Sequence, residues 1–176
     1  MIVIMGPGRC GTTIVVRLLQ AMGFDTGNAH EIFREKPHDE LRSPEFRWPR
    51  VVKGTGTLCM GLNKWAREGN WNIEVVILCN REYEEHVKQM TAWRAGRRGY
   101  RDLTPEALES RVRRELVEGY ASARKQIKDG GYRLVEIDFP RSREDKDYCY
   151  SVLRKAVPEF NRGQFNQAWD EVIDVW

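Results

Sequence analysis

Residues 1–13 read Met1-Ile-Val-Ile-Met5 and then Gly6-Pro7-Gly8-Arg9-Cys10-Gly11-Thr12-Thr13. The first five residues are apolar and partly β-branched, as in a short buried strand, and Gly6 ends the run. From Thr12 onward, apolar side chains recur at helical spacing until Gly23. This stretch therefore predicts a strand, a glycine-rich turn and a helix.

The turn has the frame of a phosphate-binding loop, because Gly6 and Gly11 enclose four residues and two threonines follow. Glycines let successive backbone N–H groups face one oxyanion, while the helix N-terminus and the threonine hydroxyls add donors. The lysine that holds the β- and γ-phosphates of a nucleoside triphosphate is absent, since Thr12 occupies its position, and a cation stands inside the loop at Arg9. We expect an anion site here; the alternative is a glycine-rich turn that binds nothing.

The rest of the chain alternates between strand and helix patterns. Strands are predicted at 51–53, 73–79 and 132–137, and helices at 58–68, 83–95, 104–130, 145–156 and 163–175. Thr104 has the character of an N-cap with Pro105 at the first helical position, and the proline-containing segment 25–49 is expected to be rich in loops. The pattern predicts an α/β fold in one domain over 1–176: a three-layer sandwich with a central, mostly parallel sheet flanked by helices, and ligands beyond the carboxyl ends of the strands.

Composition excludes several classes of protein. The 176 residues fit one domain and contain no apolar run of the roughly 18 residues needed to span a membrane. The four cysteines form no CxxC pair and no secretory signal is evident, which favours a soluble, cytoplasmic protein with free thiols. A net charge of +3 gives no support for nucleic-acid binding, but 21 of the 29 basic residues are arginines, which grip phosphate or sulfate bidentately.

The segment Arg9-Cys10-Gly11-Thr12-Thr13 resembles the [K/R]-x-G-T-T loop of sulfotransferases that use 3′-phosphoadenosine 5′-phosphosulfate (PAPS). In that family the loop grips the 5′-phosphosulfate, and a strand-end arginine with a serine eight residues later holds the 3′-phosphate. Val75-Val-Ile-Leu-Cys-Asn-Arg81 is similar to that strand, although glutamine stands in place of the serine. The resemblance implies a P-loop sulfotransferase fold that needs no metal and binds PAPS through Gly8, Arg9, Cys10, Gly11, Thr12, Thr13, Arg81 and Gln89.

The resemblance also implies sulfuryl transfer to a hydroxyl or amine of a small-molecule or carbohydrate acceptor. Many relatives take their base from a strand-end K-T-H segment, but Lys53-Gly54-Thr55 lacks the histidine. Other branches use a glutamate in a G-x-P-x-E segment, and Gly27-Asn28-Ala29-His30-Glu31 keeps that glycine and glutamate. Glu31 is therefore the expected general base, with His30 as a substitute, and Lys53 and Arg9 are the cations expected at the transferring group. An exposed glutamate and a surface lysine are the competing interpretations.

Two other functions remain open at this stage. A P-loop kinase would need magnesium and an acidic strand end, which Asp138 offers. A binding protein without catalysis would keep only the anion loop. Three further features are interpreted mainly as structural. The cluster Arg94, Arg97, Arg98 and Arg101 is expected to be a solvated loop, with contact to a nucleotide or an acidic substrate as the lesser alternative, and His86 is expected to be solvated. The tryptophans Trp48, Trp65, Trp71 and Trp93 are expected to pack in the core, with stacking against an acceptor as the lesser alternative.

Overall fold

The computed structural model describes residues 1–27, 41, 43 and 45–173. Four strands form one sheet in the order β2-β1-β3-β4, and every neighbouring pair is parallel. Their bounds are β1 (Ile2–Met5), β2 (Val51–Gly54), β3 (Val75–Arg81) and β4 (Leu134–Phe139). The predicted α/β fold with a central parallel sheet is confirmed, with strand positions correct to within two residues.

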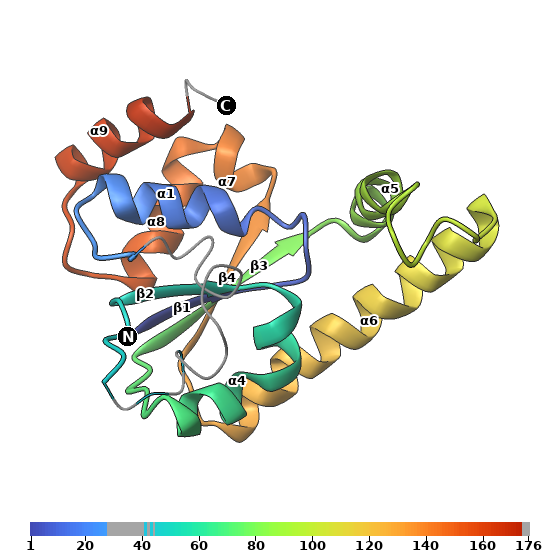
Figure 1. Ribbon diagram of the computed structural model, residues 1–176. Coiled ribbons are helices and arrows are strands. Elements are labelled where there is room, and N and C mark those ends of the chain that lie inside the picture. The colour runs from blue at the N-terminus through green and yellow to red at the C-terminus, as the bar shows by residue number, and fades with distance from the viewer. Residues whose placement is uncertain (28–40, 42, 44, 174–176) are drawn as a thin grey trace.

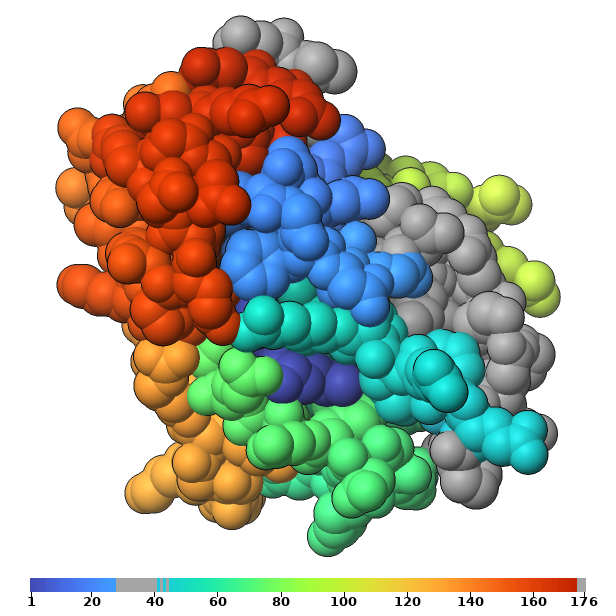
Figure 2. Space-filling view, turned by 90° about the vertical axis from the view of Figure 1, so that its left-hand side faces the viewer, coloured from blue at the N-terminus to red at the C-terminus, as the bar shows by residue number. Residues whose placement is uncertain are grey.

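Helices cover both faces of this sheet, so the fold has three layers (Figure 1). On one face lie α1 (Thr12–Ala21), α8 (Lys146–Ala156) and α9 (Arg162–Ile173), and on the other lie α4 (Gly56–Glu68) and the second half of α6 (Pro105–Asp129). In the space-filling view, α9 lies directly against α1 (Figure 2). The remaining described helices are α5 (Tyr83–Arg94) and the single turn α7 (Arg141–Glu144).

Strand β1 lies at the centre of the core because its side chains alternate between two apolar clusters. Ile2 and Ile4 pack with α1, α8 and α9, whereas Val3 and Met5 pack with α4 and α6. All four side chains are buried, which explains why the sequence of this strand is apolar throughout rather than alternating. The first cluster fixes the start of α1, and with it the loop between β1 and α1.

Helix α5 and the first half of α6, residues 83–116, form an arm that extends beyond the carboxyl ends of the strands (Figure 1). The arm has an apolar cluster of its own, which includes Val87, Met90 and Val112. The predicted cap of α6 is confirmed, since the Thr104 side chain accepts a hydrogen bond from the N–H of Ala107 at 3.3 Å and Pro105 follows it. The arm thus continues directly from β3 and forms one wall beside the strand ends.

None of the described helices combines the length and the apolar character required to cross a bilayer. Helix α6 is long enough, at 25 residues, but it is amphipathic and heavily charged. The four cysteines are buried and unpaired, as expected.

Candidate anion-binding site

The loop between β1 and α1 takes a shape that depends on glycine at both ends. Gly11 lies in the left-handed region with φ 90°, and a Cβ there would come within 2.6 Å of the Phe139 ring. At Gly6 a Cβ would come within 2.6 Å of the Cys10 Sγ and 2.7 Å of the Cys79 carbonyl oxygen. The loop therefore lies too close to β3 and β4 for side chains at these two positions.

A cavity of about 600 Å³ opens over this loop, at the carboxyl ends of the strands. It lies where ligands bind in parallel α/β sheets, and its volume is within the usual range of about 300–1,000 Å³. The structure brings together most of the ligand residues predicted from the sequence. Those that line the cavity are Gly8, Arg9, Gly11, Thr12, Thr13, Lys53, Arg81 and Gln89.

Among the predicted site residues that the structure describes, Cys10 does not line this cavity. Cys10 is fully buried within the loop, so it offers no exposed group to a ligand. Glu31 lies outside the described residues, as does the neighbouring His30.

The described lining of the cavity is positively charged. It carries five cationic side chains, and none of the described residues that line it is acidic. The cations come from five separate places in the chain: Arg9, Lys53, Arg81, Arg97 and Arg143. Such a lining attracts an anion that carries several charges.

Arg81 joins the end of β3 to the loop. Its Nη1 donates to the Arg9 carbonyl oxygen at 2.9 Å, and its guanidinium lies 4.6 Å from the centre of the Phe139 ring. Its Nε is buried and has no hydrogen-bond partner among the described residues. The Arg81 side chain is therefore not a freely solvated charge at a strand end. The guanidinium is held in place by two contacts, and one of its N–H donors is unused.

Lys53 lies on β2, the second strand that pairs with β1, and is opposite Ile4 in the sheet. Its Nζ donates to the Thr13 Oγ1 at 3.0 Å, which ties the end of β2 to the first turn of α1. Because Lys53 is partly buried and held by Thr13, the surface-lysine interpretation is also wrong. The cation lies beside the helix N-terminus, where the helix dipole also favours negative charge.

The arm contributes the wall that faces Arg81. Gln89 lines the cavity, but its Nε2 donates to the Glu85 carboxylate at 2.9 Å on the same helix. Of the arginine cluster at 94–101, Arg97 reaches the cavity, with its guanidinium 4.0 Å above the centre of the Trp93 ring. Trp93 and Arg97 thus form a flat, cationic surface on this wall. The other three tryptophans pack against one another, as the core interpretation held: Trp48, Trp65 and Trp71.

His86 is fully buried, contrary to the expectation of a solvated residue. Its Nε2 lies 2.6 Å from the Gly8 carbonyl oxygen, and its Nδ1 lies 3.2 Å from the Tyr120 hydroxyl. A carbonyl only accepts, so Nε2 carries the proton and donates to Gly8, while Nδ1 accepts from Tyr120. Burial lowers the pKa of His86, which favours this neutral form. The imidazole therefore fastens the arm to the loop between β1 and α1.

Two site residues were missed from the sequence for different reasons. His86 follows Glu84 and Glu85, which suggested a polar helix face, although its spacing to Val87 and Met90 places it on the apolar one. Arg143 lies on α7, whose single turn is too short to show a hydrophobic period. The helical spacing could therefore have identified His86 as buried, whereas the sequence gives no signal for Arg143.

Asp138, the acidic residue that a kinase would need, does not line the cavity. Its carboxylate accepts a hydrogen bond from the Tyr148 hydroxyl at 3.2 Å. The two strands next to β1 end with Lys53-Gly54 and Arg81, which are cationic rather than acidic. Within the described part of the chain, no group of three or more His, Cys, Asp or Glu side chains is arranged to hold a metal ion.

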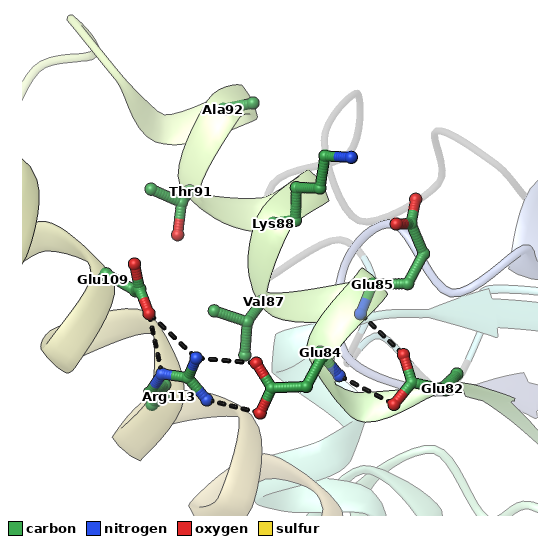
Figure 3. Close-up of a pocket in the computed structure, with 9 residues that line it drawn as sticks. All are labelled: Glu82, Glu84, Glu85, Val87, Lys88, Thr91, Ala92, Glu109 and Arg113. Carbon is green, nitrogen blue, oxygen red and sulfur yellow. Dashed lines mark hydrogen bonds and ion pairs between the residues drawn. The ribbon is translucent and has the colours of Figure 1, made fainter.

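A second hollow, between α5 and α6, is lined by four glutamates (Figure 3). These carboxylates already have structural roles. Glu82 caps α5 by accepting from the N–H groups of Glu84 and Glu85, at 3.0 and 2.7 Å. The Arg113 guanidinium donates to Glu84 at 2.7 Å and to Glu109 at 2.9 Å, which lowers the pKa of Glu84. This hollow is a surface ion-pair network, and we do not regard it as the functional site.

Comparison with known proteins adds no family assignment: no protein-family model matches the chain, and no curated protein is detectably similar to it in sequence.

Proposed function

We propose that the protein is a sulfotransferase that binds PAPS in the cationic cavity and transfers its sulfuryl group to a hydroxyl or amine. The observation that carries the proposal is the joining of the loop, Lys53 and Arg81 in one cavity whose described lining has no acidic residue. PAPS carries anionic groups at both the 5′ and the 3′ position of one nucleoside. A single-phosphate ligand would not need cations on both neighbours of β1.

Each part of the cavity has a role in this proposal. The backbone N–H groups of the loop and the N-terminus of α1 hold the 5′-phosphosulfate, together with Thr12 and Thr13. Arg81, which lines the cavity, holds the 3′-phosphate with its guanidinium. Arg9 and Lys53 stabilise the negative charge that develops on the sulfuryl oxygens and on the leaving phosphate. The flat surface of Trp93 and Arg97 is available to the adenine ring.

The chemistry is an in-line displacement at sulfur. The acceptor oxygen or nitrogen forms a bond to sulfur, the bond from sulfur to the phosphate oxygen breaks, and adenosine 3′,5′-bisphosphate leaves with the bonding electrons. The acceptor proton passes to a general base, for which Glu31 remains our proposal. The strand ends that adjoin the loop supply cations and no carboxylate, which favours this reaction over magnesium-dependent phosphoryl transfer.

The first experiment compares nucleotides by thermal denaturation. We expect adenosine 3′,5′-bisphosphate, without magnesium, to raise the melting temperature by about 5–10 °C at a hundredfold excess over its Kd. ATP should do little without magnesium. Stabilisation by ATP with magnesium and none by the bisphosphate would favour the kinase and refute the sulfotransferase.

The second experiment tests Arg81. Arg81→Ala should abolish the preference for adenosine 3′,5′-bisphosphate over AMP, because AMP lacks the 3′-phosphate. Arg98→Ala is the matched control, since Arg98 is exposed and does not line the cavity. An unchanged preference in Arg81→Ala would remove this residue from the site.

The third experiment separates transfer from binding. If Glu31 is the base, Glu31→Gln should reduce turnover by about 10²–10⁴-fold while the binding of adenosine 3′,5′-bisphosphate persists. Transfer of labelled sulfate from PAPS to a panel of alcohols and amines provides the readout. A protein that binds the bisphosphate but transfers sulfate to no acceptor would instead be a binding protein without catalysis.

A further inference from the structure

A second cavity, of about 370 Å³, adjoins the cationic one on the side of α4 and the arm. Its walls come from α4, α5 and α6, and they are mainly apolar, with Met60, Met90, Trp93 and Leu116 among them. Met60 is 63% exposed, so the cavity is open to solvent on the α4 side. A concave apolar site of this volume is suited to a small organic molecule.

The two cavities meet at the phosphate-binding loop. Gly8, Thr55 and Trp93 line both of them. Thr55 directly follows the β2 end that carries Lys53, and Pro7 of the loop lines the second cavity as well. A molecule in the second cavity therefore lies next to the loop, whereas Arg81 lines the first cavity and not the second. This is the arrangement that a two-substrate transfer needs, because both substrates must reach one point.

The second cavity differs from the first in charge. Arg94 is its cation, and Arg94 forms an ion pair with Glu115, which also binds Arg111. Glu118 lines the same cavity, and its carboxylate has no hydrogen bond or ion pair with any other described residue. Among the described residues, Glu118 thus adds a negative charge to this lining that no described cation neutralises, whereas the described lining of the first cavity has five cations and no acid. An anionic molecule is disfavoured here, and an uncharged or cationic one is not.

We propose that the second cavity is the acceptor site, and that the acceptor is an uncharged or cationic molecule with an apolar body and one hydroxyl or amine. This proposal rests on the proposed function. The apolar body lies among Met60, Met90 and Leu116, and the hydroxyl or amine points toward Thr55 and Gly8, where the cavities meet. The hydroxyl or amine attacks sulfur in its neutral form and passes its proton to the general base, while the sulfur–oxygen bond to the phosphate breaks. Adenosine 3′,5′-bisphosphate leaves with the bonding electrons, and a sulfate ester or sulfamate is released. The small volume excludes a long oligosaccharide from this cavity.

Equilibrium binding of 2-naphthol tests the location of this site without requiring turnover. The protein is saturated with adenosine 3′,5′-bisphosphate, and 2-naphthol binding is followed by fluorescence. Met60→Arg places a long charged side chain at the mouth of the cavity and should weaken 2-naphthol binding by about tenfold or more. Val117→Arg is the matched control, because Val117 is 57% exposed on α6 and does not line the cavity. Both variants should retain the binding of the bisphosphate.

A second pair of probes tests the charge. At neutral pH, 2-naphthol should bind more tightly than 3-hydroxy-2-naphthoate, which adds a carboxylate. Glu118→Gln should reduce the ratio of the two dissociation constants. Three outcomes would each overturn the acceptor site. They are no binding of 2-naphthol, equal effects of Met60→Arg and Val117→Arg on its binding, and a ratio of dissociation constants that Glu118→Gln leaves unchanged. These failures are distinct from failure of the proposed function, which would appear as no stabilisation of the unaltered protein by adenosine 3′,5′-bisphosphate.

Discussion

Replacing Gly11 by alanine tests whether the loop lies against β4 as closely as the structure indicates. Two costs add at this position. Alanine with φ 90° is strained by about 1–2 kcal/mol. Its Cβ would also come within 2.6–2.9 Å of three atoms of Phe139, and such overpacking costs about 1–3 kcal/mol. The sum is about 2–5 kcal/mol of unfolding free energy.

Gly23 provides a control with nearly the same backbone strain and no contact. Its φ is 89°, and no atom lies within 4 Å of the position that a Cβ would occupy. Gly23→Ala should therefore cost about 1–2 kcal/mol, the strain alone. The difference between the two variants measures the contact with Phe139. Urea denaturation followed by tryptophan fluorescence gives both free energies by linear extrapolation.

A third variant completes this test. Phe139→Ala removes the contacts with Cδ2 and Cγ at 2.6 and 2.8 Å and keeps the one with Cβ at 2.9 Å, so in that background Gly11→Ala should cost less than it does in the unaltered protein. Equal costs for Gly11→Ala and Gly23→Ala in the unaltered protein would refute the close approach of the loop to β4. An undiminished cost of Gly11→Ala in the Phe139→Ala background would refute the identity of the contact.

Three further predictions concern His86, Lys53 and Thr104. Burial of the neutral imidazole lowers the pKa of His86 in the folded protein, so below the ordinary value of 6.5 the unfolded chain binds the proton more readily. The contribution of His86 to the unfolding free energy is therefore full above pH 6.5 and falls below it, by at most about 1.4 kcal/mol per pH unit. In His86→Gln this part of the pH dependence of the unfolding free energy should be absent, as measured by urea denaturation at a series of pH values. The same pH dependence in the variant and the unaltered protein would contradict a buried neutral imidazole. Lys53→Met should weaken the binding of adenosine 3′,5′-bisphosphate by about tenfold, as measured by calorimetry. Lys64→Met, which alters an exposed lysine of α4, should leave this binding unchanged. Equal affinities of the two variants for the bisphosphate would exclude Lys53 from the site. Thr104→Ala should lower the unfolding free energy by about 1 kcal/mol, because it removes the side-chain acceptor for the Ala107 N–H, and no loss would show that α6 does not need this cap.

Much of the fold could be predicted because its signals are local. A run such as Val75–Arg81 is apolar enough to be buried on both faces, and Thr104 with Pro105 marks the start of a helix within two residues. The order of the strands and the identity of the residues around the loop depend on contacts between distant parts of the chain. Arg81 was identified through its place at a strand end, whereas Arg143 lies at the cavity only because α7 follows β4 at the edge of the sheet.

The roles of individual side chains were harder to predict than their positions. Gln89 was expected to replace a serine as a ligand donor, and it does line the cavity, but its amide is held by Glu85. His86 was assigned to the solvent because its two preceding neighbours are acidic, yet the ring turns inward toward Gly8 and Tyr120. A helix of twelve residues has room for both faces, and sequence neighbours on it point in different directions.

The hydrogen bond from His86 to Gly8 spans 78 positions of the chain, and that from Arg81 to Arg9 spans 72. The loop between β1 and α1 is therefore not complete when residues 1–23 have folded locally, since its shape also depends on a helix that is synthesised much later. Such long-range contacts form late and slowly, because a large loop of chain must first be closed. If the arm detaches in a fraction of native molecules, the affinity of the loop for any anion falls in proportion to the molecules that remain closed. Substitutions at the interface between the arm and the sheet would then change ligand affinity without touching the ligand.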